Sequence, residues 1–116
     1  MILVIGGAAS GKRDYVRGLG YEESQFATGA IDNRPVVDRL QEIVAADKDA
    51  AEGLLEVLCA KEVVICDEVG SGVIPAERHE REVREATGRL CNQLAGHAEK
   101  VVRLVAGIPV VIKGGA

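Results

Sequence analysis

The fold is decided by the first twelve residues, which read MILVIGGAASGK from Met1 to Lys12. The unbroken apolar run from Met1 to Ile5 predicts a strand buried on both faces, the kind found in parallel sheets. A glycine-rich turn follows, and we expect a short helix over Lys12 to Leu19 because Gly18 and Gly20 stop it there. A buried strand, a tight glycine turn and a helix in this order form the setting of a phosphate-binding loop.

The turn fits the pattern G-x-x-x-x-G-K of such a loop. Its glycines let the backbone curl around a phosphate with the N–H groups pointing inward, while Lys12 reaches the β and γ oxygens. A dinucleotide-binding turn would need a glycine at position 8, which is alanine. The alternative is an ordinary glycine-rich strand-to-helix turn. The residues that we expect to bind the nucleotide are Gly6, Gly7, Ala8, Ala9, Ser10, Gly11, Lys12 and Arg13.

Position 13 departs from this pattern, since Arg13 stands where a serine or threonine hydroxyl would ligate Mg²⁺. A guanidinium carries only donors and cannot ligate a metal. The alkyl stem of Arg13 can instead bring its positive charge close to the phosphates that the loop binds. We therefore expect ATP or GTP to bind with a weakened or unusual Mg²⁺ site, and any phosphoryl transfer to be weak or unusual in its demand for metal.

Two carboxylates follow the second strongly apolar strand, which we expect over Val63 to Cys66. Asp67 and Glu68 stand at its carboxyl end, where open α/β sheets place their sites. A carboxylate that faces the glycine loop from there would hold Mg²⁺ directly or through water. We therefore predict Lys12, Asp67 and Glu68 as catalytic residues and Asp67 as the metal ligand. The alternative is a pair of solvated acids that cap a turn.

The remaining pattern completes an α/β fold with a small, mainly parallel sheet flanked by helices. The expected helices span 34–46, 49–60 and 76–98, and the expected strands span 25–28, 101–105 and 109–112. A two-residue link at Gly107-Ile108 predicts a hairpin, so the C-terminal edge strand is antiparallel. Residues 1–116 are thus expected to form one P-loop NTPase-like domain.

The composition and net charge of this chain limit the classes of partner that it is expected to bind. Its 116 residues and 12.2 kDa suit one domain. Lys and Arg number 14 against 18 Asp and Glu, a net charge of −4, and aromatic residues make up 3%. Neither a basic surface nor an aromatic platform for nucleic acid is expected. No apolar run approaches the roughly 20 residues of a membrane span, and no signal segment is recognisable. Cys59, Cys66 and Cys91 form neither a disulfide framework nor a C-x-x-C metal site, so the cytoplasm is the expected location.

Four blocks of this sequence resemble segments of one family. The opening MILVIGGAASGK resembles the start of its members. Val63 to Pro75 (VVICDEVGSGVIP) resembles the segment N/D-E-V-G-x-G-I-V-P, and Arg78 to Leu94 resembles the helix R-x-x-R…G-R-x-N-Q. Val101 to Lys113 is similar to the ending V-x-x-V-x-G-I-P-V-x-I-K. Together the blocks are specific, and the family they resemble is the bifunctional adenosylcobinamide kinase / adenosylcobinamide-phosphate guanylyltransferase family.

The resemblance implies a P-loop protein of cobalamin biosynthesis. Members of the family phosphorylate the aminopropanol hydroxyl of adenosylcobinamide with ATP or GTP, and then transfer GMP onto that phosphate through a guanylyl-histidine. They work as oligomers with sites between subunits. Since a small sheet also leaves open edges that are commonly covered, we expect a homo-oligomer. The implied partners are a nucleotide and a corrinoid small molecule.

The histidines decide which step the resemblance predicts. Residues 21–61, where the guanylylated histidine belongs, contain none. His79 and His97 both lie on the last expected helix beside its apolar face, so we expect core or interface packing of them rather than covalent chemistry. The resemblance therefore predicts the kinase step alone. The alternative is a non-catalytic or regulatory nucleotide-binding module, and position 13 is the feature that favours it.

Overall fold

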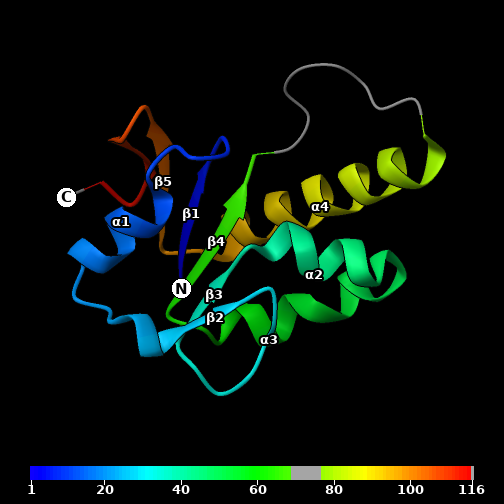
Figure 1. The fold of residues 1–116 in the computed structure, drawn as a ribbon, viewed down its shortest axis with the longest axis horizontal. Helices are drawn as coiled ribbons and strands as arrows, with labels where there is room; N and C mark the ends of the chain where they lie inside the picture. Colours follow the sequence, from blue (N-terminus) through cyan, green and yellow to red (C-terminus); the bar gives the residue numbers. More distant parts are fainter. Residues whose placement is uncertain (69–76, 116) are drawn as a thin grey trace.

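One sheet of six strands organises the computed structural model, which describes residues 1–68 and 77–115. The strands are β1 Ile2–Gly6, β2 Phe26–Thr28, β3 Val36–Asp38, β4 Val63–Asp67, β5 Lys100–Val105 and β6 Ile108–Lys113. Their order is β2-β3-β4-β1-β5-β6, so β1 lies between β4 and β5 (Figure 1). Neighbouring strands run parallel except β5 and β6, which are antiparallel. The sheet confirms the predicted α/β class and its antiparallel C-terminal edge strand.

Helices cover both faces of the sheet. The α-helices are α1 Lys12–Gly18, α2 Leu40–Ala46, α3 Leu55–Cys59 and α4 Arg78–His97, and 3₁₀ helices occupy Glu23–Gln25 and Lys48–Leu54. Val16 of α1 packs with Val4 and Ile65 on one face, whereas α2, α3 and α4 pack on the other (Figure 1). No helix within the described ranges is long and apolar enough to cross a membrane. Both faces of the central strands are thus buried, as their apolar runs predict.

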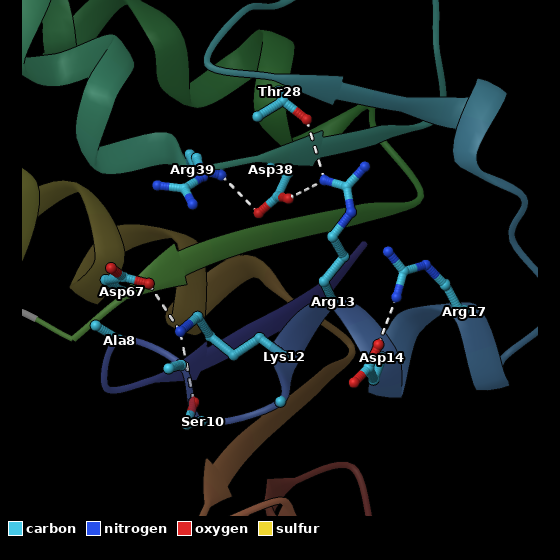
Figure 2. A pocket seen from close by; sticks show the side chains of 12 residues that line it. Ala8, Ser10, Lys12, Arg13, Asp14, Arg17, Thr28, Asp38, Arg39 and Asp67 are labelled. Carbon is cyan, nitrogen blue, oxygen red and sulfur yellow. Dashed lines mark hydrogen bonds and ion pairs between the residues drawn. The ribbon is translucent and has the colours of Figure 1, made fainter.

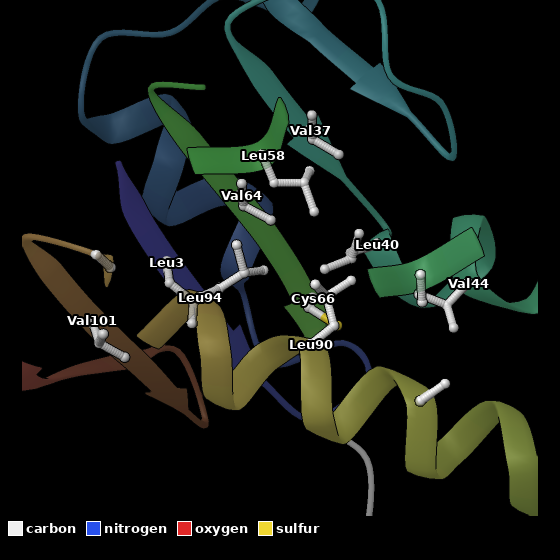
Figure 3. Close-up of a cluster of buried hydrophobic side chains, with 13 residues drawn as sticks. Leu3, Val37, Leu40, Val44, Leu58, Val64, Cys66, Leu90, Leu94 and Val101 are labelled. Atoms are coloured by element: carbon white, nitrogen blue, oxygen red, sulfur yellow. The ribbon is translucent and has the colours of Figure 1, made fainter. Parts of the chain in front are cut away.

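The larger core cluster lies between the sheet and α4. Alternate residues of β1 point to opposite faces, so Leu3 joins this cluster while Val4 joins the one under α1. Leu90 and Leu94 of α4 are buried in the larger cluster (Figure 3). The apolar face expected on the last helix is therefore the face that packs on the sheet.

Strand β3 corrects one sequence prediction. The expected helix over 34–46 is wrong in its first part, because β3 lies there between β2 and β4. Val36 and Val37 are fully buried, one on each face of the sheet, and β-branched side chains suit that position. Arg39 then adopts a left-handed conformation with φ 57°, which separates the strand from α2.

The expected helix over 49–60 is only partly α-helical. Its first part is the 3₁₀ helix Lys48–Leu54, and α3 covers the rest as far as Cys59. Gly53 lies in the 3₁₀ part, and the backbone entropy of glycine disfavours an α-helix there. The two parts together place Ala51 and Leu58 in the larger core cluster.

The C-terminal hairpin turns at Ala106 and Gly107, one residue earlier than the expected Gly107-Ile108 link. Both residues have positive φ, 50° and 78°, the combination that gives a two-residue turn the twist of its strands. The amide of Gly107 donates a hydrogen bond to the carbonyl oxygen of Ser10 at 2.9 Å. The hairpin thus contacts the glycine-rich loop.

Polar contacts tie down the loop between β2 and β3. Arg34 pairs with Asp32 at 2.6 Å and donates to the carbonyl oxygen of Phe26 at 2.9 Å. Lys61 donates to the carbonyl oxygens of Asp32 and Arg34. Hydrogen bonds from Arg34, chiefly those of its side chain, lower the pKa of Asp32 to about 2. These contacts hold β3 beside β2.

We expect the carboxyl of Asp32 to titrate near pH 2, whereas an unperturbed aspartate has a pKa of about 4. Because the folded pKa is depressed, the stability that Asp32 contributes is present above about pH 4 and is lost as the pH falls toward 2. Side-chain NMR of Asp32 in an acid titration measures the midpoint. In Asp32→Asn, the melting temperature should vary less with pH in this window. A midpoint of about 4 would contradict the ion pair.

Candidate phosphate-binding site

The glycine-rich loop requires glycine at both of its ends. A Cβ at Gly6 would lie 2.5 Å from Ser10 Oγ and 2.8 Å from the carbonyl oxygen of Leu104. Gly11 has φ +92°, and a Cβ there would lie 3.3 Å from Gly107 Cα. The spacing G-x-x-x-x-G therefore reflects one close backbone approach and one left-handed turn.

Backbone hydrogen bonds brace the loop between these ends. The amide of Ser10 donates to the carbonyl oxygen of Gly7 at 3.2 Å, and Ala9 within this turn has φ 57°. The amide of Gly107, in the hairpin, donates a hydrogen bond to the carbonyl oxygen of Ser10. Ala8 and Ala9 are exposed. The loop is thus preformed on β1 and the hairpin, and its crown is accessible.

Lys12, the first residue of α1, is buried against the loop. Its Nζ donates to the carbonyl oxygen of Gly7 at 2.6 Å and to Ser10 Oγ at 3.4 Å. Nζ also lies 2.7 Å from Asp67 Oδ1 (Figure 2). The parallel register of β1 and β4 sets Gly6 opposite Asp67, which brings the loop and this carboxylate together. The structure thus places Lys12 and Asp67, both predicted site residues, in contact.

Glu68 has a different partner. Its carboxylate oxygens lie 2.5 Å from Nε and 3.1 Å from Nη2 of Arg103, on β5. This hydrogen bond raises the pKa of Arg103. Adjacent residues at a strand end point their side chains apart, and of the two carboxylates only Asp67 lines the cavity beside the loop, among the described residues. The structure therefore separates the two acids that spacing left equivalent.

Arg13 points toward the ends of β2 and β3. Its Nη1 donates to Thr28 Oγ1 at 3.1 Å and to Asp38 Oδ2 at 2.5 Å (Figure 2). Its Nη2 donates to Glu23 Oε2 at 2.5 Å. The guanidinium lies 4.4 Å from the centre of the Phe26 ring. The hydrogen bond to Glu23 is the main cause of a raised pKa of Arg13. The guanidinium is therefore held by two carboxylates rather than over the glycine loop.

The loop opens into a cavity of about 700 Å³, within the range of roughly 300–1,000 Å³ usual for small-molecule sites. The described residues around it include four cationic and three anionic side chains. The local charge is thus positive in a chain whose net charge is −4. The lining residues are Ala8, Ala9, Ser10, Gly11, Lys12, Arg13, Asp14, Arg17, Thr28, Asp38, Arg39 and Asp67.

Five of these lining residues escaped the sequence prediction: Asp14 and Arg17 lie on α1, and Thr28, Asp38 and Arg39 lie at strand ends. Thr28 ends β2, and Asp38 ends β3 with Arg39 next to it. They share the sheet edge with Asp67, since the carboxyl ends of parallel strands meet there. That rule points to Asp38 only once β3 is recognised as a strand, and the sequence pattern around Asp38 predicts a helix instead.

The histidines lie away from this cavity. His79 and His97 are both exposed on α4. Of the two expected roles, core or interface packing, packing in the core of the chain is therefore wrong, and interface packing stays a prediction. The side chain of His97 contacts the carbonyl oxygen of Gln93 one turn earlier, at 3.0 Å. Part of the family-like segment, residues 69–75, lies outside the described residues.

Comparison with known proteins identifies the family. The model of the cobinamide kinase / cobinamide phosphate guanyltransferase family matches residues 25–112, beginning after the glycine-rich loop. A bifunctional adenosylcobalamin biosynthesis protein, CobU of Escherichia coli (strain K12), is 44% identical over 54 residues, which cover 47% of this chain and 30% of that protein. The CobU protein of Salmonella typhimurium (strain LT2) is 35% identical over 80 residues, 69% of this chain and 40% of that protein.

The matched region thus spans less than half the length of either relative. Within this chain, however, the family match runs from β2 to the last strand and includes Asp38 and Asp67 at the cavity. Strand β1 and the preformed loop precede the match, and the mainly parallel sheet that β1 completes is consistent with the fold of the same family. On this agreement of sequence and fold, the chain belongs to the cobinamide kinase / cobinamide phosphate guanyltransferase family.

Proposed function

We propose that this chain is a nucleoside-triphosphate-dependent kinase that phosphorylates adenosylcobinamide. The observation that carries the proposal is the Lys12–Asp67 pair, which joins a preformed glycine loop to a carboxylate at the edge of a cavity. Phosphoryl transfer needs mainly positioning and charge neutralisation, and these groups supply both. The family supports the acceptor, because its description names cobinamide as the substrate of the kinase.

In this proposal the triphosphate of ATP or GTP lies along residues 6–12, with backbone amides on its oxygens. Lys12 Nζ turns from Asp67 Oδ1, 2.7 Å away, to the β and γ oxygens. The ion pair of the free protein therefore keeps the cation in place until a phosphate replaces the carboxylate. The exchange leaves Asp67 facing the cavity with an unpaired carboxylate.

The freed carboxylate of Asp67 fits Mg²⁺, which prefers hard oxygen ligands and keeps several waters. The side chain is 31% exposed at the cavity. The described residues contain no group of three His, Cys, Asp or Glu side chains that would hold a metal by themselves. We therefore expect Mg²⁺ to be held by Asp67 together with phosphate oxygens and water, where it neutralises charge on the phosphates.

The kinase step is the one that we propose, without guanylyl transfer. Residues 21–61 contain no histidine, and His79 and His97 are exposed on α4. Neither lines the cavity beside the loop, which supports a proposal limited to the kinase step. A second candidate function is a regulatory module that binds nucleotide without turnover. The feature that favours it is Arg13, which stands in place of the Mg²⁺-ligating hydroxyl.

A homo-oligomer is also part of the proposal, and β6 supports it. All six residues of this edge strand are exposed, including Ile108 at 64% and Ile112 at 57%. An exposed apolar edge strand is a template for pairing with another chain. We therefore place a second copy of the chain on β6. The three cysteines are free thiols, which suits the reducing cytoplasm as the place of this assembly.

For the nucleotide site, we expect Lys12→Ala to abolish stabilisation by ATP or GTP and phosphorylation of adenosylcobinamide. A ligand at 100 times its Kd stabilises the native protein by about 2.7 kcal/mol, so thermal shift with a nucleotide series measures the loss. Lys100→Ala is the matched control, because Lys100 lies opposite Ile2 at the far end of β1 from the loop. Equal stabilisation of wild type and Lys12→Ala would show that the loop is not the site.

For the metal, we expect Arg13→Ser to bind nucleotide with a stronger dependence on Mg²⁺. The new hydroxyl supplies the missing ligand, and a gain of about 1.4 kcal/mol would raise the ratio of Kd without to Kd with Mg²⁺ tenfold. The melting temperature should fall, since the ion pairs with Asp38 and Glu23 are lost. Arg17→Ser is the control, because Arg17 also pairs with Glu23. An unchanged ratio would contradict this account of position 13.

For assembly, we expect Ile112→Lys to dissociate the oligomer, because a charge on β6 opposes burial of that strand in a partner. Light scattering of wild type and variant measures the molar mass. Val57→Lys is the control, since Val57 is 47% exposed on α3, away from the sheet edge. A wild-type protein that is monomeric at micromolar concentration would refute the placement of a second copy on β6.

A further inference from the structure

A second carboxylate–cation pair faces the same cavity, and the proposed function does not use it. Lys12 pairs with Asp67 at the end of β4, and the next residue, Arg13, pairs with Asp38 at the end of the neighbouring strand β3 (Figure 2). The two distances are 2.7 and 2.5 Å. Consecutive residues of α1 thus reach the carboxyl ends of adjacent strands.

Asp38 is the most buried acid at the cavity. Its side chain is 8% exposed, against 31% for Asp67 and 81% for Asp14. Asp14 pairs with Arg17 at the surface of α1. Asp67 pairs with Lys12 and, in the proposed function, holds Mg²⁺ at the phosphates. Among the described acids that line the cavity, Asp38 is therefore the one that is both sheltered from solvent and not engaged with the glycine loop.

Two bonds fix the orientation of the Asp38 carboxylate. Oδ2 accepts from Arg13 Nη1, and Oδ1 accepts from the amide of Arg39 at 2.8 Å. The second bond depends on the left-handed conformation of Arg39, φ 57°, which is uncommon outside glycine. A carboxylate has about four acceptor positions, so two bonds leave Asp38 able to accept another from a ligand in the cavity.

Arg13 is itself held from three other sides. Thr28 Oγ1 and Glu23 Oε2 accept from its guanidinium, and the ring of Phe26 lies against it. These contacts hold the guanidinium in one position. The guanidinium in turn holds the Asp38 carboxylate that it binds. Arg13 therefore acts through Asp38, as a positioning residue.

We propose that Asp38 is the catalytic residue that binds the acceptor hydroxyl and takes its proton, an inference that rests on the proposed kinase function. The hydroxyl oxygen attacks the γ phosphorus, and the bond from that phosphorus to the β–γ bridging oxygen breaks. The nucleoside diphosphate leaves with the bonding electron pair. The hydroxyl proton passes to the Asp38 carboxylate and from there to water. An aspartate in this role is known from phosphoryl transfer in general, where it orients the attacking oxygen.

The position of Asp38 suits this role, because it shares one cavity with the loop but approaches it from another strand. The nucleotide occupies the loop side at Lys12, and the acceptor then lies on the side of Thr28, Asp38 and Arg39. The two substrates thus meet above the start of α1, between the two ion pairs. The positive charge of Arg39, which is half exposed, faces the same space.

The test is Asp38→Asn, which keeps the size of the side chain and an oxygen for Arg13 but removes the base. Turnover of adenosylcobinamide is measured at saturating nucleotide and Mg²⁺, and nucleotide-induced thermal stabilisation is measured on the same samples. We expect kcat to fall about 100-fold or more, with stabilisation by nucleotide unchanged. Asp49→Asn is the matched control, because Asp49 is 88% exposed and does not line this cavity, and its kcat should stay within about twofold.

A second variant separates chemistry from folding. Asp38→Ala, assayed below its melting temperature with added formate, should regain turnover at least tenfold, because the small carboxylate fills the space beside Arg13. A kcat of Asp38→Asn within threefold of wild type would overturn the inference and leave the proposed function intact. Loss of nucleotide stabilisation in Asp38→Asn, or no rescue of a folded Asp38→Ala, would also overturn it. A wild-type protein that binds nucleotide but transfers no phosphate would end both proposals.

Discussion

Strands β1 and β4 pair in parallel so that Gly6 lies opposite Asp67, and the candidate site depends on this register. A shift by one residue would turn every side chain of β1 to the other face of the sheet, because strand side chains alternate. Leu3 and Val4 would then exchange the two core clusters. The core that fixes the register therefore also fixes where the loop begins relative to the carboxylate that Lys12 binds.

The parts of the fold that local patterns specify could be predicted from the sequence. The apolar run before Gly6 and the run before Asp67 are strands, and α4 buries the arc that its spacing predicts. Strand β3 could not be predicted in the same way, because Val36 and Val37 also fit one face of a helix. What makes them a strand is their place between two neighbours, which only the assembled sheet supplies.

The candidate site also contains some residues that local patterns predict and others that only the assembled fold brings together. The glycine spacing and Lys12 point to phosphate from their own positions, whereas Asp67 and Glu68 are equivalent until the direction of each side chain is known. The contact between Arg13 and Asp38 joins residues 25 positions apart, and no periodicity reports it. The net charge of the chain does not predict the charge of the site either. The cavity is lined by more cationic than anionic side chains, although the chain as a whole is acidic.

The turn at Ala106 and Gly107 belongs to two structures at once. It closes the hairpin of β5 and β6, and through the amide of Gly107 it also forms one wall of the glycine loop. The hairpin that carries the outer strand and the glycine loop are therefore joined by a direct hydrogen bond, from Gly107 to Ser10. If binding at β6 and binding at the loop are coupled through this contact, each must change the affinity of the other by the same factor, because coupling between two sites is reciprocal.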